Sequence, residues 1–272
     1  MSGMDGLGHC GRRCVGHATN LVGRPSDWLS SAHFNDSPAP LQIWGVLETN
    51  RSLFGMLERA GDLAEAGEAF SNYMMATFGL DPEQREKGRF RLSFRRLIAG
   101  WSFDSNGAEG AVLKGWVESR FGIWPSFHKQ VLDEPSGAAF AAYVEEKMAS
   151  RFHGNAIWPQ LDLLFEFCQW AIARFAFPGQ THLTLYRGVN NFDEHWIIER
   201  VGKREAVIRL NNLVSFSTDR DVAGCFGDKI LTARVPLCKL LFFNGLLSSP
   251  QLKGEGEHLA IGGDFRVRVD YV

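Results

Sequence analysis

The stretch WPQLDLLFEFCQWAIARFAFPGQTHLTLYRGV, residues 158–189, changes its hydrophobic period near the middle. Up to Phe177, apolar residues recur every three or four positions and Pro159 stands near the start, which predicts a helix. Pro178 and Gly179 end that helix. The HLTLYRGV that follows is a short β-type run bounded by turn residues, which predicts a strand. The chain therefore changes from helices to strands at about residue 180.

From residue 41 to this point the pattern is mainly helical. WGVLETNRSLFGMLERAGDLAEAGEAFSNYMMATFGL (44–80) and SGAAFAAYVEEKMASRF (136–152) both have apolar residues at helical intervals. REKGRFRLSFRRLIAGW (85–101) predicts another helix, although the alternation at 89–95 leaves a strand possible. Beyond residue 189, short β-type runs separated by turn residues occupy 205–219, 229–243, 257–265 and 266–272.

The expected fold class is α+β, with a helical N-terminal part packed on a strand-rich C-terminal part. Residues 1–40 are rich in Gly, Ser, Asn and Pro and end in NDSPAP, so we expect a loosely structured arm there. We expect one domain over residues 41–272, mainly helical at 41–180 and strand-rich at 181–272.

Composition limits the class of protein. The chain has 272 residues, 45% of them hydrophobic, and a net charge of −2, so we expect no nucleic-acid partner, which would favour a strongly basic chain. The first residues contain no continuous apolar segment of the signal-peptide kind, and no apolar run is long enough to span a membrane. Five cysteines without a framework spacing favour a reducing compartment, so we expect a cytoplasmic protein.

Three further motifs are unspecific. GLGHCG (6–11) has the spacing of a dinucleotide-binding loop, but no strand precedes it, so we treat it as chance. A nearby cluster of His9, Cys10, Cys14 and His17 could in principle hold zinc, but the second-knuckle arrangement usual in structural zinc sites is absent, so we expect no metal. We expect Cys168 to be a small core residue.

The segment Arg85–Arg96 contains six basic residues in twelve, with Phe90 and Phe94 among them. It reads either as a solvated helix face or as a docking patch for an acidic partner protein or for nucleotide phosphates. We favour a protein-docking surface as the hypothesis to test.

Two carboxylates stand close together in LKGEGEHLAIGGDF (252–265), just where a strand is expected to begin. In an extended segment Glu255 and Glu257 point the same way, about 6–7 Å apart. Such a pair suits cation binding or the stabilisation of positive charge that develops on a substrate. As an isolated feature it would equally fit two acids exposed on a loop.

Two other polar features lie on expected strands. Arg187 ends the apolar run LTLYR, where its guanidinium can fork onto phosphate oxygens, and the adjacent Gly188 would let a ligand ring approach the backbone. In LVSFSTD, Ser215 and Ser217 share one face of the strand, where a hydroxyl can hold a carboxylate in place. Arg, Ser-x-Ser and Glu-x-Glu thus occur in this order, each at a strand.

That order resembles the R-S-E class of mono-ADP-ribosyltransferases. The resemblance implies that Arg187 contacts the phosphates and ribose of NAD, and that Ser215 steadies the catalytic Glu257. It also implies that Glu255 directs the reaction to arginine. The fold it implies is the ADP-ribosyltransferase fold, with split mixed or antiparallel sheets. NAD would be the co-substrate, and no metal would be required.

Further positions follow the same resemblance. It assigns Ser217, as the second serine of the Ser-x-Ser motif, to the NAD site, together with Asn212, three residues before Ser215. Phe226 would lie against nicotinamide, with Phe216 as the other aromatic that could stack there. The resemblance places the basic Lys229 just beyond Phe226.

Over longer segments, the sequence is similar to the dinitrogenase reductase ADP-ribosyltransferases of nitrogen-fixing bacteria. Examples are HFNDSPAPLQIWGVLETNRSLF (33–54) and LYRGVNNFDEH (185–195). This likeness implies that the protein substrate is dinitrogenase reductase, the iron protein of nitrogenase. Modification of an arginine would inactivate it and so regulate nitrogen fixation, and a PII-type signal protein would be the regulator. The segment from Arg187 onward is short for this fold, so preceding helices must supply part of the NAD-binding domain.

Other functions fit part of the pattern. An NAD glycohydrolase, or an arginine ADP-ribosyltransferase acting on another protein, would share all the NAD contacts. A glycoside hydrolase also uses two acids, but it would leave Arg187 and the Ser-x-Ser motif unexplained. A non-catalytic interaction protein with a vestigial pocket would not need the full set of residues.

Overall fold

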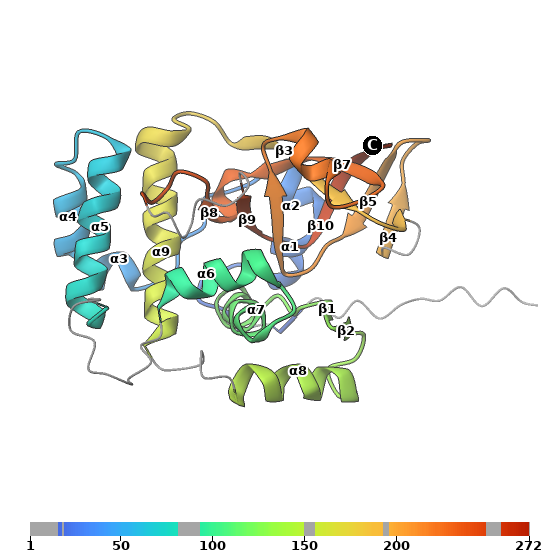
Figure 1. Cartoon of the computed structure of the whole chain (residues 1–272), viewed down its shortest axis with the longest axis horizontal. Coiled ribbons are helices and arrows are strands. Elements are labelled where there is room, and N and C mark those ends of the chain that lie inside the picture. The colour runs from blue at the N-terminus through green and yellow to red at the C-terminus, as the bar shows by residue number, and fades with distance from the viewer. Residues whose placement is uncertain are drawn as a thin grey trace, which may run out of the picture.

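The computed structural model describes residues 16–17, 19–80, 93–149, 156–192, 196–248 and 257–271. Within these residues helices precede a large sheet, as the change of period at residue 180 predicts, and the α+β class is confirmed (Figure 1). The helices are α1 Ser26–Ser30, α2 Ala32–Asp36, α3 Val46–Thr49, α4 Arg51–Leu57, α5 Leu63–Phe78, α6 Phe94–Phe103, α7 Ala108–Phe121, α8 Ala138–Ala149, α9 Ile157–Ala171 and α10 Arg220–Gly224.

The strands of the C-terminal part form one sheet, and a two-residue hairpin precedes them. The strands are β1 Phe127–His128, β2 Gln130–Val131, β3 His182–Val189, β4 Trp196–Arg200, β5 Glu205–Arg209, β6 Leu213–Ser217, β7 Lys229–Pro236, β8 Leu240–Phe243, β9 Glu257–Ile261 and β10 Asp264–Tyr271.

The segment that left helix and strand open is helical from Phe94, as α6. The Oγ of Ser93 accepts from the N–H of Arg95 at 3.2 Å and so caps the first turn. Phe94, Leu97, Ile98 and Trp101 are buried, which is the three- and four-residue spacing of one helix face. Residues 81–92 lie outside the described residues.

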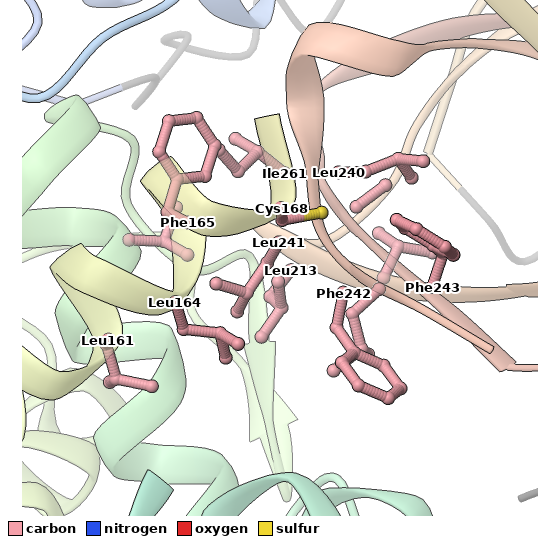
Figure 2. Close-up of a cluster of buried hydrophobic side chains, with 14 of the residues drawn as sticks. Leu161, Leu164, Phe165, Cys168, Leu213, Leu240, Leu241, Phe242, Phe243 and Ile261 are labelled. Atoms are coloured by element: carbon pink, nitrogen blue, oxygen red, sulfur yellow. The ribbon is translucent and has the colours of Figure 1, made fainter. Parts of the chain in front are cut away.

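Helix α9 is the centre of the helical part. In Figure 1 it stands between α4 and α5 on one side and the sheet on the other, while α6, α7 and α8 follow one another below the sheet, with α8 farthest from it. Figure 2 shows its apolar face meeting the strands that carry Leu213, Leu240 and Ile261. Cys168 lies within this contact, fully buried, and burial raises the pKa of its thiol well above the ordinary value. The prediction that Cys168 is a core residue is confirmed.

The large sheet has the strand order β4-β5-β10-β7-β3-β6-β9-β8, and each described pair is antiparallel. Eight residue pairs join β3 to β7, whereas β3 and β6 meet through the single pair Tyr186–Ser217. Of the expected split mixed or antiparallel sheets, the described strands show the antiparallel arrangement, and they form one sheet that is nearly divided between β3 and β6.

Part of the expected N-terminal arm is folded. Within 1–40, helices α1 and α2 bury Leu29 and Phe34, which are 1% and 0% exposed. The Nδ2 of Asn35 donates to the main-chain carbonyl of Asp264 in β10 at 2.8 Å, and His182 contacts the carbonyl of Asn35 at 2.8 Å. The polar composition of this segment gave no sign that Leu29 and Phe34 are buried. Helix α2 packs against β7 and β10, so the segment is held on the sheet. Among the described residues no helix has the length and apolar character needed to cross a membrane.

Candidate active site

Ser215 and Glu257 are neighbours on adjacent strands. The antiparallel register pairs Ser217 with Glu257, so Ser215 lies diagonally opposite the carboxylate and on the same face. The Oγ of Ser215 donates to Oε1 of Glu257 at 2.6 Å. This is a short hydrogen bond to a charged acceptor, and it fixes one oxygen of the carboxylate.

Arg187 reaches the same point from β3. Its Nη1 donates to the main-chain carbonyl of Ser215 at 2.8 Å. Burial lowers the pKa of the Arg187 guanidinium from its ordinary value, and the negative charge of Glu257 acts in the opposite direction. The arginine, the serine and the second glutamate of the sequence pattern thus converge from β3, β6 and β9.

Helix α6 supplies two contacts that no sequence motif indicated. The indole Nε1 of Trp101 donates to Oγ of Ser215 at 2.7 Å, and Oγ of Ser102 donates to Oε2 of Glu257. Both carboxylate oxygens therefore accept a hydroxyl donor, one from the sheet and one from the helix. The sequence required some helical contribution because the segment after Arg187 is short, but it gave no means of choosing these residues.

A model of the family described as dinitrogenase reductase ADP-ribosyltransferase (DRAT) matches residues 19–269. The chain belongs to this family. It is 58% identical over 266 residues to the NAD(+)--dinitrogen-reductase ADP-D-ribosyltransferase of Rhodospirillum rubrum, and the match covers 95% of this chain and 96% of that protein. No solved structure matches the chain.

In this DRAT family member, Gly188 and Ser217 hold the turn that carries Phe226. A Cβ on Gly188 would lie 2.0 Å from the carbonyl oxygen of Ala223, so the missing side chain makes room for α10. The Oγ of Ser217 accepts from the N–H of Asp219 at 3.0 Å, just before α10 begins. Contact of Gly188 and Ser217 with NAD stays a prediction, whereas their support of α10 is visible.

The two aromatic candidates for stacking on nicotinamide differ in exposure. Phe226 is 59% exposed on the turn after α10, where its ring is open to a ligand. Phe216 is 3% exposed, and its ring centroid lies 5.8 Å from that of Phe265 in the core. The alternative that placed Phe216 against nicotinamide is therefore wrong, because strand alternation turns this ring away from Ser215 and Ser217.

Lys229 begins β7 and pairs with Val189, two residues beyond Arg187 in β3. Its Nζ lies 5.8 Å and 5.6 Å from the ring centroids of Phe192 and Tyr271. These contacts hold the amine near the end of β3, and binding of NAD by Lys229 stays a prediction.

Asn212 has a different place from the one that the resemblance implied. Its side chain is 1% exposed, and its Nδ2 donates to the main-chain carbonyls of Lys114 at 2.9 Å and Ile123 at 3.0 Å. With both amide protons used inside the protein, Asn212 joins the start of β6 to α7. We therefore correct its assignment from cofactor contact to positioning of β6.

Several predicted features lie outside the described residues: Glu255, the segment from Arg85 to Leu92, the GLGHCG motif, and His9, Cys10 and Cys14. Within the part of the chain that is described, no group of three or more His, Cys, Asp and Glu side chains could hold a metal ion.

Proposed function

We propose that the chain is an NAD-dependent mono-ADP-ribosyltransferase that transfers ADP-ribose to an arginine of dinitrogenase reductase and thereby inactivates it. Support comes from the Rhodospirillum rubrum relative, an NAD(+)--dinitrogen-reductase ADP-D-ribosyltransferase that is 58% identical over nearly the whole of both chains. The observation that carries the proposal is the convergence of Arg187, Ser215 and Glu257 at one point of the sheet.

The chemistry of these three side chains fits an anionic dinucleotide whose ribose becomes positive. Nicotinamide leaves as a neutral group while positive charge develops on the ribose ring. The Glu257 carboxylate stabilises that charge more in the transition state than in the ground state, because the charge is absent before the bond breaks. Arg187 supplies a guanidinium for the phosphates, and it already lies beside the pair.

The acceptor is a guanidinium, which stays protonated in water. Glu255 stands two residues before Glu257 and carries the charge that would bind and orient it. In this scheme one acceptor nitrogen attacks the ribose carbon, the bond to nicotinamide breaks, and the acceptor releases a proton. Glu255 either takes that proton or only orients the acceptor.

Regulation by a PII-type signal protein belongs to the same proposal, with the basic segment Arg85–Arg96 as the docking surface for a protein partner. Arg95 and Arg96 lie in the first turn of α6, the helix that contacts Ser215 and Glu257. A cytoplasmic location fits the cysteines, because Cys168, Cys225 and Cys238 are free thiols among the described residues.

The test uses labelled NAD, purified dinitrogenase reductase and two variants. We expect wild-type protein and Glu68→Gln, a control on the exposed face of α5, to transfer label equally. Glu257→Gln should lose about 10²–10³ of the rate, since it removes the negative charge that faces the ribose. NAD hydrolysis without transfer would favour a glycohydrolase, and transfer to other proteins alone would favour a different acceptor.

A further inference from the structure

Trp101 and Ser102 are consecutive residues of α6 that contact two different members of the proposed catalytic pair. Trp101 donates to Ser215 at 2.7 Å, and Ser102 donates to Glu257. Successive helix residues point about 100° apart, so a helix can place both side chains on the pair only when it lies close to the middle of β6 and the start of β9.

The hydrogen-bond donors fix the direction of this chain of contacts. An indole nitrogen can only donate, so the Ser215 oxygen must accept from Trp101. The single hydroxyl proton of Ser215 is then left for Oε1 of Glu257, at 2.6 Å. Trp101 therefore selects the one orientation of the Ser215 hydroxyl that supports the carboxylate.

We propose that Trp101 and Ser102 are positioning residues for the transfer reaction, with Trp101 acting through Ser215 and Ser102 acting directly on the carboxylate. The proposal rests on the proposed function, specifically on Glu257 as the residue that faces the ribose. A carboxylate held on both oxygens has its charge oriented before the substrate binds, so little reorganisation remains for the transition state.

The ring of Trp101 is in turn contacted by Lys114 of α7. The Nζ of Lys114 lies 5.8 Å from the Trp101 ring centroid, and the side chain is 1% exposed. It is fixed by three groups: Oδ1 of Asn106 at 3.1 Å, the carbonyl of Phe127 at 3.0 Å and Nδ1 of His128 at 3.2 Å. The indole thus rests on a side chain that is fixed at several points, which limits its rotation.

The start of α6 is anchored as well. The N–H of Phe94 donates to Oε1 of Gln160 on α9 at 3.0 Å, and Gln160 is 1% exposed. At Gly100, next to Trp101, a Cβ would lie 2.5 Å from the Glu109 side chain of α7. Both ends of the helix are thereby set against α7 and α9, and the contacts to Ser215 and Glu257 depend on that position.

The experiment compares Ser102→Ala and Trp101→Phe with matched controls elsewhere. Ser71→Ala removes a hydroxyl that bonds a carbonyl of its own helix α5, and Trp116→Phe removes an indole donor that bonds Asp162 at 2.8 Å. We expect each α6 variant to lower kcat for both NAD hydrolysis and arginine transfer by about tenfold, with KM for NAD nearly unchanged. The controls should keep wild-type kcat per folded molecule, with the folded fraction measured by thermal melting.

Two further variants separate positioning from a structural role. Ser102→Thr retains the hydroxyl and should restore most of the rate. Trp101→Phe should cost nothing further in a Ser215→Ala background, because its effect passes through that hydroxyl. Unchanged kcat in both α6 variants would overturn the proposal, and so would additive losses in the double variant. Wild-type rates for Glu257→Gln would overturn the assignment of Glu257, and the proposal with it.

Discussion

Tyr186 and Ser217 form the single residue pair through which β3 and β6 meet in the described sheet. On the far side of β3 the ladder to β7 continues over eight pairs. Arg187 follows Tyr186 in β3, and its guanidinium donates to the carbonyl of Ser215 in β6. A side-chain cation, a hydroxyl and a carboxylate therefore meet where β3 and β6 are joined by this single pair.

Arg187→Lys tests whether the guanidinium beside Ser215 is needed for NAD binding. Lysine is a point charge without the planar fork, so it cannot bond the Ser215 carbonyl and a phosphate in the same geometry. We expect NAD affinity to fall by about tenfold or more, measured by calorimetric titration. Arg200→Lys, at the end of β4, is the control, and equal losses in both variants would contradict a specific role for Arg187.

Gly188→Ala tests whether this glycine serves packing or ligand approach. The new Cβ would meet the Ala223 carbonyl at 2.0 Å, so α10 must move away from β3. We expect the melting temperature to fall even without NAD. Gly55→Ala in α4 meets nothing within 4 Å and should be neutral or stabilising by about 0.5–1 kcal/mol. A Gly188→Ala variant with unchanged melting temperature but weakened NAD binding would favour the ligand role.

The features that sequence predicted best are those with local periodicity. Strand alternation placed Ser215 and Ser217 on one face, and the antiparallel register then brought Glu257 beside them. Trp101 and Ser102 could not be predicted, because their role depends on where α6 lies relative to β6 and β9. That position is fixed by long-range contacts such as Phe94 to Gln160.

The predictions for Asn212 and for the N-terminal segment were wrong for a related reason. A spacing relative to Ser215 says nothing about which way the Asn212 amide turns, and the carbonyls of Lys114 and Ile123 lie close enough to take both protons. In the N-terminal segment, Leu29 and Phe34 are too few for a periodic signal, yet each is almost wholly buried against the rest of the fold.

Reversal of charge at Arg95 and Arg96 tests the docking hypothesis. We expect Arg95→Glu with Arg96→Glu to reduce modification of dinitrogenase reductase by about tenfold or more at low salt. The reason is that the basic patch would no longer steer association with the partner protein. NAD hydrolysis should be spared, since the substitutions lie at the opposite end of α6 from Ser102. Equal loss of both activities would show instead that the substitutions disturb Glu257 through the helix.

We expect Glu166 to make the free energy of unfolding depend on pH. It lies 4% exposed on α9, where its Oε1 accepts from the N–H of Ile43 at 2.6 Å. Burial raises the pKa of Glu166 from 4.5 to about 7, the charges of Asp162 and Glu48 add to this, and the Ile43 bond opposes it. Between pH 4.5 and 7 the folded state therefore binds more protons than the unfolded state. Raising the pH through this window lowers the free energy of unfolding.

Glu166→Gln should remove this loss of stability at high pH. An amide does not ionise in this pH range, and its oxygen can still accept from the N–H of Ile43. The gap between the two pKa values corresponds to about 3 kcal/mol as an upper limit. We expect urea unfolding at pH 8 to show the variant more stable than wild type by up to this amount, and the two to be nearly equal at pH 4.5. Glu68→Gln, on the exposed face of α5, should follow wild type at both values. A Glu166→Gln variant that is less stable at pH 8 would mean that the buried carboxylate contributes more through its charge than its burial costs.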